Sequence, residues 1–588
     1  MSGGDSRAPV SVDHVWANVR VFLPGGRVPA ACQLGGDGLG PHLAELADLA
    51  VVVGVDARPG RGWTAVAAPA DRAPFADRSF ELVAVEDLGA TGRPTERVLE
   101  EARRLCRPTG SVLLGFRAGP LQRLRLPGSR LGDPVLVALP SAQRPAFLLR
   151  PDDHEAVGYF LRRVAFAYRK PRAAGVGASL QQAASRVALA APTDLAIRAA
   201  PGRLTVARGP AAPRSLLEGV HALVRDCWAE LELPGTPPGR LATLMVGHRR
   251  PTTGMVTALL FRPGDHAPVV VAKLPRYGAT GAPLRREAQA LDAVWRALRG
   301  AVRDAIPRPL GLHRIDGTEV LLQTGVPGSH LVASTASGRL HPATVARQLD
   351  LALAWCVAMQ AASGRSVVVD DALIATRIEP LASAVLAVLD GDRPVASLLD
   401  RTIAQARRLR GTRLPLVVCH GDYWAGNILV RDGRVCGVVD WERAAVDDLP
   451  LWDPVKAVGS AAYHLDRYRS LPRRGQGALP HWGDLGPWTG VADPQFAAGF
   501  RAAFVEQGWL ADLSRRALVE AFRRAGVPLD WLAVAVRMYL LRQVLDAEDS
   551  PRSVAGWGSV LRALAAAPAT WADEFGAGRT ITVEASRG

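Results

Sequence analysis

The side chains best suited to chemistry lie close together in the chain, between residues 415 and 440. Asp422 closely follows an apolar run, Asn427 comes five residues later, and Asp440 follows two further apolar runs. An Asp432-Gly433 dipeptide separates these two runs, and Asp-Gly between apolar runs predicts a hairpin with a type I′ turn. A loop followed by a hairpin should therefore present two carboxylates and one amide in a small region.

The hairpin sets the spacing of these groups. Closing it at the Asp-Gly turn pairs Val430 with Val435. This register places Asn427 opposite Val438, with Asp440 two residues beyond. Oxygen donors at this spacing suit Mg²⁺, which takes few protein ligands and keeps its other positions for water and phosphate. Phosphoryl transfer also needs a carboxylate near the acceptor hydroxyl and positive charge on the phosphates, so the segment predicts magnesium-dependent phosphoryl transfer.

This segment resembles the aminoglycoside phosphotransferase and choline kinase-like family, whose members are relatives of protein kinases. The family's HGDxxxxN loop corresponds to the run from His420 to Asn427. Its metal-binding DW or DF motif corresponds to Asp440-Trp441, and its downstream acidic-Pro element is similar to Trp452-Asp453-Pro454. The likeness covers roughly residues 215 to 575 and is most specific in the catalytic segment.

The resemblance implies a role for each of these residues. Asp422 would be the base that orients or deprotonates the acceptor hydroxyl, and Asn427 and Asp440 would hold magnesium. ATP would be the phosphoryl donor. The implied fold is a bilobal, protein-kinase-like one, with a small sheet-rich lobe before a larger helical lobe.

An upstream lysine adds to this interpretation. The chain has three lysines, Lys170, Lys273 and Lys456, among 71 basic residues. Lys273 ends an apolar run, and a lysine kept where arginine is the general choice indicates a need for a compact ammonium, as on ATP phosphates. Glu287 follows in a predicted helix and could pair with it, as in the strand-lysine and helix-glutamate pair of kinases. The alternative is a surface lysine and a solvated glutamate.

Further candidate features lie on both sides of these residues. Three strand-like runs are predicted at residues 241–246, 255–262 and 268–274. A loop from Gly247 to Gly254 should cover the phosphates. Residues 321–328, which include Gln323, are similar to the interlobe hinge, whose backbone would bind adenine. Five acidic residues between 440 and 453 either receive magnesium and a cationic substrate or form a solvated helix face.

The N-terminal part has a different pattern. Residues 30–115 alternate short apolar runs with helix-like stretches such as 96–106, which predicts a parallel sheet covered by helices. Its elements occur in the order found in class I S-adenosylmethionine-dependent methyltransferases, which this part resembles. The elements are the glycines Gly36, Gly38 and Gly40, then Asp56, the Ala73-Pro74-Phe75 segment, and the run from Glu101 to Gly110.

This second resemblance implies a Rossmann-like sheet with S-adenosylmethionine held by the three glycines and by Asp56. Two positions depart from the pattern. The acid expected two residues before Gly36 is Leu34, and another expected acid is replaced by Pro69. The domain is therefore either an active methyltransferase or a degenerate, structural or partner-binding one.

The predicted fold class is α/β plus α+β, with a Rossmann-like methyltransferase-type sheet before a bilobal kinase-like part. The chain of 588 residues is long enough for two or three domains. A capping box at Ser215-Leu216-Leu217-Glu218 predicts that a new domain begins there. The predicted parts are a methyltransferase-like domain at 1–170, a linker at 171–214, a kinase-like N-lobe at 215–328 and a helical C-lobe at 329–588.

The composition of the chain argues against several classes of protein. The six cysteines are scattered singly, which argues against a disulfide framework or a zinc site. No run is long and apolar enough for a membrane span, and the N-terminus lacks the apolar stretch of a signal peptide, so a soluble, cytoplasmic protein is expected. The formal charge is +15, but the arginines are dispersed, which argues against a nucleic-acid partner.

The leading hypothesis is an ATP- and magnesium-dependent phosphotransferase that acts on a small-molecule hydroxyl and is fused to a methyltransferase-like domain. One alternative is a methyltransferase whose kinase-like part only binds a ligand. Another is a bifunctional enzyme that phosphorylates and methylates a glycan or natural product. The sequence specifies neither the acceptor nor the oligomeric state.

Overall fold

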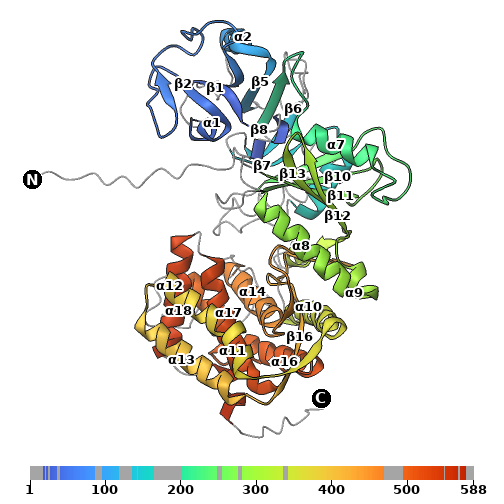
Figure 1. Ribbon diagram of the computed structural model, residues 1–588, viewed down its shortest axis with the longest axis vertical. Helices are drawn as coiled ribbons and strands as arrows, with labels where there is room; N and C mark the ends of the chain where they lie inside the picture. The colour runs from blue at the N-terminus through green and yellow to red at the C-terminus, as the bar shows by residue number, and fades with distance from the viewer. Residues whose placement is uncertain are drawn as a thin grey trace, which may run out of the picture. The chain divides into compact units, whose positions relative to one another are not determined.

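The computed structural model in Figure 1 shows a sheet-rich part, coloured blue to green, and a mainly helical part, coloured yellow to red. It describes residues 18–19, 21–23, 27–35, 40–85, 96–117, 135–141, 144–164, 202–247, 255–275, 281–334, 342–468, 494–547, 550–566 and 570–577. The chain divides into two compact units. Unit 1 takes its residues from Met1–Arg162, Ala184–Ala288 and Arg308–Gly325, and unit 2 from Arg163–Ala183, Gln289–Pro307 and Val326–Gly588.

Unit 1 is built on one 13-stranded sheet with the order β12-β13-β11-β10-β9-β7-β6-β8-β5-β4-β1-β2-β3. The strands are β1 (Val28–Leu34), β2 (Ala47–Val53), β3 (Thr64–Val66), β4 (Phe80–Val85), β5 (Cys106–Arg117), β6 (Val135–Ser141), β7 (Arg144–Leu149), β8 (Gly202–Arg208), β9 (Ala242–Gly247), β10 (Met255–Phe261), β11 (Val270–Pro275), β12 (Pro309–Ile315) and β13 (Thr318–Thr324). The sheet therefore includes strands from both the predicted methyltransferase-like part and the predicted N-lobe.

The N-terminal strands form the predicted parallel arrangement. Strand β1 lies between β2 and β4, β3 pairs with β2, and β5 pairs with β4, all in parallel. Helices α1 (Gly40–Leu46) and α2 (Glu96–Leu105) connect the strands. In β4, Leu82 and Ala84 join one apolar cluster while Val83 and Val85 join another. Both faces of the sheet are thus buried, as expected of parallel strands.

The predicted linker at 171–214 needs a correction. Its residues 202–208 form strand β8, which pairs antiparallel with both β5 and β6. Leu204 and Ala207 are buried there in two different apolar clusters, so this strand packs on both faces despite its Ala, Pro and Arg-rich surroundings. Residues 171–201 lie outside the described part of the chain.

The second half of unit 1 contains the three predicted strands as β9, β10 and β11, paired antiparallel. Helix α7 (Leu216–Asp226) begins with the predicted capping box, because Ser215 Oγ accepts from Glu218 N at 3.2 Å and the Glu218 carboxylate accepts from Ser215 N at 2.9 Å. Strand β12 was not predicted. Its turn to β13 is Asp316-Gly317, both with positive φ, and this Asp-Gly dipeptide is the signal that would have revealed it.

Polar contacts join the two halves of unit 1. Helix α4 (His154–Tyr159), which continues as the π-helix η2 (Phe160–Val164), starts beside Asp153. The Asp153 carboxylate accepts from Thr243 N at 2.9 Å and forms an ion pair with Arg240. Glu155 accepts from Gly264 N at 2.8 Å, and β7 pairs with β9. The two halves therefore form one structural unit.

Unit 2 is mainly helical, with two small three-stranded sheets ordered β14-β17-β18 and β15-β16-β19. Helix α8 (Ala282–Ala297) spans the division between the units. The other elements are α9 (Gly300–Asp304), β14 (Ser329–His330), η3 (Leu331–Ser334), α10 (Pro342–Ser363), β15 (Arg365–Val368), α11 (Asp371–Arg377), α12 (Glu379–Val388), α13 (Arg393–Arg408), β16 (Arg413–Cys419), β17 (Ile428–Arg431), β18 (Arg434–Val438), β19 (Ala445–Asp448), α14 (Trp452–Tyr468), α15 (Pro494–Phe504), α16 (Trp509–Arg524), η4 (Leu529–Trp531), α17 (Leu532–Asp546), α18 (Pro551–Ala566) and η5 (Trp571–Ala577).

Two further features concern the cysteines and the helices. All six cysteines are free thiols. Among the helices in the described ranges, none has the length and apolar character needed to cross a membrane.

Candidate active site

The predicted hairpin is strands β17 and β18 in unit 2. Asp432 and Gly433 both have positive φ, at 52° and 72°, which is the conformation that a type I′ turn requires. Val430 pairs with Val435, as predicted. The register then shifts at a β-bulge, so that Leu429 pairs with Gly437. One extra residue in β18 therefore changes every pair beyond the bulge.

Because of the bulge, Asn427 does not lie opposite Val438, where it was predicted. Val438 faces Ile428 instead, and the carbonyl of Asn427 accepts a hydrogen bond from Val439 N at 2.9 Å. Asp440 is the next residue and adopts a left-handed conformation, with φ of 71°. Asn427 and Asp440 thus lie at the same end of the hairpin, one position closer in register than the sequence suggested.

His420 links the catalytic loop to this end of the hairpin. It is fully buried, directly after β16. Its Nε2 lies 2.9 Å from the Val439 carbonyl, and its Nδ1 accepts from Asp422 N at 3.2 Å. Because a carbonyl oxygen can only accept, Nε2 is the donor of this ring in the contact with Val439, and Nδ1 is its acceptor. His420 therefore acts as a structural bridge that sets the position of Asp422.

Gly421 and Asp453 determine the path of the same loop. Gly421 has φ of 80°, and a Cβ there would lie 2.3 Å from the Arg443 carbonyl oxygen, so only glycine fits. Asp453, near the start of α14, is fully buried and accepts from His420 N at 2.6 Å and from Gly421 N at 3.0 Å. Burial raises the pKa of Asp453, although these hydrogen bonds oppose the change.

Asp422 and Asn427 contact each other directly. The Asn427 Nδ2 donates to the Asp422 carbonyl at 3.0 Å and to Asp422 Oδ2 at 3.2 Å. Because the amide nitrogen is used in this way, the remaining polar atom of the side chain, Oδ1, is the one that can ligate a cation. The predicted base and one predicted metal ligand are therefore neighbours.

Lys456 is a site residue that the sequence reasoning missed. It lies on α14, and its Nζ is 3.1 Å from Asp422 Oδ1 and 3.2 Å from Asp546 Oδ2. Asp546 also pairs with Arg443. The sequence does carry a signal for it, because Lys456, like Lys273, is one of only three lysines in a chain that otherwise uses arginine.

The acidic residues between 440 and 453 do not form a common rim. Asp453 holds the catalytic loop, and Asp448 is buried against Arg542 and the indole nitrogen of Trp452. Asp447 is half-exposed, 3.7 Å from Arg365. Two of the five acids, Asp448 and Asp453, are thus structural, whereas Asp440 and Glu442 have carboxylate oxygens within 4.8 Å of each other and could hold a cation.

In unit 1, the structure brings Lys273 and Glu287 together. Both are buried, and the Lys273 Nζ donates to Glu287 Oε1 at 2.5 Å. Lys273 lies in β11, between Thr257 of β10 and Leu321 of β13. A central strand therefore holds the ammonium, and α8 supplies the carboxylate.

Other predicted nucleotide-binding features are partly described. Gln323 is buried in β13 and faces Val271. The chain passes from unit 1 to unit 2 after Gly325, inside the predicted hinge segment. Gly247 ends β9, while residues 248–254 of the predicted phosphate loop lie outside the described part of the chain.

The structure describes only some of the residues predicted to bind the cofactor in the N-terminal part. Gly36 and Gly38 lie outside the described residues. Gly40 begins α1, and a Cβ there would be 2.8 Å from the Trp63 ring, so this glycine is needed for packing. Asp56 is exposed in the turn after β2. Because β1 and β2 are parallel, Asp56 follows the same ends of the strands as the glycine-rich segment after β1.

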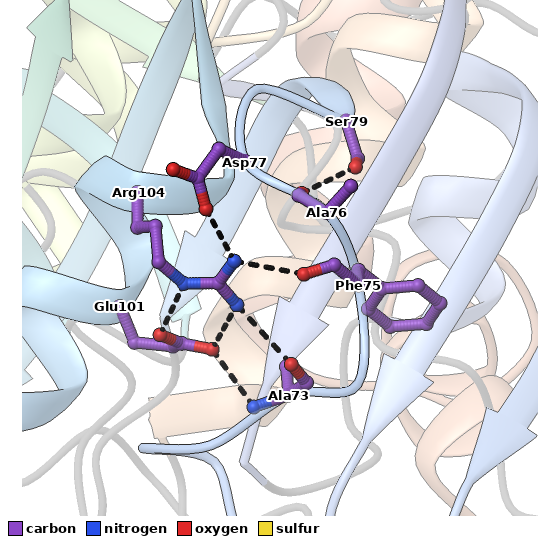
Figure 2. A network of polar contacts seen from close by, with 7 residues as sticks. All are labelled: Ala73, Phe75, Ala76, Asp77, Ser79, Glu101 and Arg104. Carbon is purple, nitrogen blue, oxygen red and sulfur yellow. Dashed lines mark hydrogen bonds and ion pairs between the residues drawn. The ribbon is translucent and has the colours of Figure 1, made fainter.

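Two other elements of the N-terminal pattern meet around Arg104, as Figure 2 shows. Glu101 accepts from Ala73 N at 2.8 Å and from Arg104, whose guanidinium also donates to the Phe75 carbonyl at 2.8 Å and to Asp77 at 2.7 Å. The hydrogen bond from Arg104 lowers the pKa of Glu101. The network attaches the loop that contains Phe75 to α2.

Several solved structures are similar to this chain. A thermostable mutant of aminoglycoside phosphotransferase APH(4)-Ia, in its apo form, is 14% identical and covers 58% of this chain and 96% of its own, with a TM-score of 0.33. A glucosamine kinase is 19% identical and covers 58% and 83%, with a TM-score of 0.32. Aminoglycoside phosphotransferase APH(3'')-Id from Streptomyces rimosus ATCC10970 is 16% identical and covers 57% and 98%, with a TM-score of 0.30. No curated protein matches the chain.

A family model matches the part of the chain that contains these site residues. Residues 260–488 match the model described as "Phosphotransferase enzyme family". The matched range includes Lys273, Glu287 and the whole segment from His420 to Asp453. This part of the chain is therefore similar to the phosphotransferase enzyme family, and the match supports a phosphotransferase with a hydroxyl group as acceptor.

Proposed function

We propose that the chain transfers the γ-phosphoryl group of ATP to a hydroxyl of a small molecule, with Asp422 as the base. The observation that carries this proposal is the contact between Asn427 Nδ2 and Asp422 Oδ2 at 3.2 Å. It places a carboxylate, which can receive a proton, beside an amide oxygen, which can ligate a cation. Phosphoryl transfer requires both functions.

The donor set suits magnesium. Asn427 Oδ1 and the Asp440 carboxylate are hard oxygen ligands at the same end of one hairpin, and few protein ligands are what Mg²⁺ usually takes when it is also bound to phosphates. When bound, magnesium would neutralise charge on the phosphate oxygens and orient them. The buried ammonium of Lys273, positioned by Glu287, would add positive charge to the phosphates of ATP.

The reaction then needs one proton transfer by the protein. As the acceptor oxygen bonds to the γ-phosphorus, the bond from that phosphorus to the β–γ bridging oxygen breaks. Asp422 takes the proton from the acceptor hydroxyl, and ADP leaves with the bridging oxygen. Asn427 and His420 fix the position of Asp422 during this step, since both form hydrogen bonds with it.

The test is ADP release from magnesium-ATP in the presence of a panel of hydroxyl-bearing metabolites, with product masses measured in parallel. We expect a product heavier by one phosphoryl group for the wild type. Asp422→Asn should abolish turnover and leave the calorimetric affinity for ATP almost unchanged, because the amide keeps the shape but cannot accept the proton. Normal turnover in this variant would remove Asp422 from the mechanism.

We also propose that the N-terminal part is a methyltransferase-like domain that binds S-adenosylmethionine. The support is the strand order β3-β2-β1-β4-β5, whose direction reverses between β1 and β4, the place where such sheets bind nucleotides. Titration calorimetry with S-adenosylmethionine would test this, with Asp56→Ala as the variant expected to lose affinity. A lack of binding to the wild type would leave this domain with a structural or partner-binding role. A cytoplasmic location likewise remains a prediction.

A further inference from the structure

We propose that Lys456 is a positioning residue for phosphoryl transfer, which acts by fixing the orientation of the Asp422 carboxylate. The inference rests on the proposed function of Asp422 as the base. Lys456 lies on α14, far from Asp422 in the sequence, and the resemblance to known phosphotransferases assigned it no role.

Lys456 and Asn427 together hold both oxygens of Asp422. Oδ1 lies 3.1 Å from Lys456 Nζ, and Oδ2 accepts from Asn427 Nδ2 at 3.2 Å. A carboxylate held at one oxygen can still rotate about its axis, whereas one held at both has a fixed plane. Each oxygen keeps a second lone pair for the acceptor hydroxyl, so the base is oriented without being blocked.

Lys456 is itself held from the other side. Its Nζ lies 3.2 Å from Asp546 Oδ2, and Asp546 pairs with Arg443, which makes a chain of alternating charges that ends at Asp422. The Lys456 side chain is only 13% exposed, whereas that of Asp422 is 29% exposed. A mostly buried ammonium needs partner carboxylates, and this requirement keeps Nζ in one place.

The position of Asp546 indicates that this series of ion pairs does not serve to stabilise helix α17. Asp546 is the last residue of α17, where the helix dipole disfavours a carboxylate. Its contacts with Lys456 and Arg443 offset that cost. Close packing fixes α14 against α17 nearby, because a Cβ on Gly459 would lie 2.5 Å from the Tyr539 ring. The two helices therefore hold the ammonium in a fixed place between Asp546 and Asp422.

The test compares variants of the full-length protein by ADP release from magnesium-ATP, with water as the acceptor and then with the best hydroxyl compound of the panel. Lys456→Met should lower kcat by about 100-fold, the loss that misplacement of a reacting group by about 1 Å can cause. KM for magnesium-ATP should change by less than about two-fold, since the partners of Lys456 are Asp422 and Asp546. Lys456→Arg should recover a large part of kcat, and Asp546→Asn should lose about 10-fold.

A matched control separates this role from a structural one. Arg365→Met removes the cation of a half-exposed ion pair in the same unit and should leave kcat unchanged. If Lys456→Met does not fold, Lys456→Arg and Asp546→Asn carry the comparison, with folding checked by thermal unfolding. Wild-type kcat in folded Lys456→Met, or equal losses in the Met and Arg variants, would overturn the inference and leave the proposed function intact. No ADP release by the wild type with any acceptor would overturn both.

Discussion

The buried carboxylate of Asp453 accepts a hydrogen bond from the backbone N–H of His420, at 2.6 Å. Its other oxygen accepts from Gly421 N, so one side chain from α14 binds both residues that precede the base. The loop therefore depends on a group that lies more than thirty positions downstream. This contact is the structural role of the Trp452-Asp453-Pro454 element: its carboxylate holds the catalytic loop.

Replacement of Asp453 by asparagine should reduce turnover by about 10- to 100-fold, because an amide has one acceptor oxygen where the carboxylate has two. One backbone N–H would lose its partner, at a cost of about 1–3 kcal/mol in the free energy of unfolding. Steady-state kinetics and denaturant unfolding would measure both effects. Asp447→Asn, at a half-exposed position close by, is the control and should behave as the wild type. Equal kinetics for the two variants would contradict the role of Asp453.

Two glycines with similar φ angles, 80° at Gly421 and 72° at Gly433, should respond very differently to alanine. At Gly421 a Cβ would lie 2.3 Å from backbone, and at Gly433 nothing lies within 4 Å. Gly433→Ala should therefore cost only about 1–2 kcal/mol of stability, from the left-handed conformation alone, and keep its turnover. Gly421→Ala should in addition displace Asp422 and lower kcat by at least about 100-fold. Comparable kcat values in the two variants would show that the loop can adjust.

The Asp153 contacts should contribute strongly to the stability of unit 1. Its side chain is 3% exposed, accepts from Thr243 N and pairs with Arg240. Asp153→Ala should lower the free energy of unfolding by about 1.5–3 kcal/mol, the range for hydrogen bonds to charged groups. Asp152 also faces Arg240, at 3.4 Å, but is 65% exposed, so Asp152→Ala should cost less than about 0.5 kcal/mol. Urea unfolding of both variants tests this, and a similar cost in both would reject it.

The stability of unit 1 should also depend on pH through His221. Its Nε2 lies 2.8 Å from the Thr243 hydroxyl, and burial, with nearby Arg150 and Arg225, lowers the pKa of His221 to about 4. The unfolded imidazole titrates near pH 6.5. Between these two pH values the unfolded chain binds a proton that the folded chain does not, so stability should fall as the pH falls.

The expected loss between pH 6.5 and 4 is at most about 3 kcal/mol. Chemical unfolding from pH 8 to pH 4 measures it as the difference between the wild type and His221→Gln, which cancels the other titrating groups. The two proteins should differ increasingly as the medium is acidified through this window. Parallel pH profiles would show that His221 does not titrate in this way.

Local signals in the sequence predicted local structure well. The Asp-Gly turn, the capping box at Ser215 and the pairing of Lys273 with Glu287 each depend on residues close in the chain, and all three are present. The bulge in β18 could not be predicted in this way. Its extra residue, Cys436, packs its sulfur 2.9 Å from the Pro327 carbonyl, a contact between distant segments.

The same limit explains the missed lysine. The partner of Lys456 on α17 is 90 positions away, and no periodicity in either helix indicates that they meet. Likewise, β8 was assigned to a linker because its pairing partners, β5 and β6, belong to an earlier part of the chain. In both cases tertiary contacts, rather than local preference, decide the outcome.

The pairing of β7 with β9 has a practical consequence for dividing this protein. A fragment that begins at Ser215 would keep β10 on one side of β9 but lose β7 on the other. Backbone donors and acceptors around Val246 would then face water along an open sheet edge, the kind of surface on which chains pair with copies of themselves. Self-association of the isolated phosphotransferase-like part through this edge would follow from the loss of this one strand.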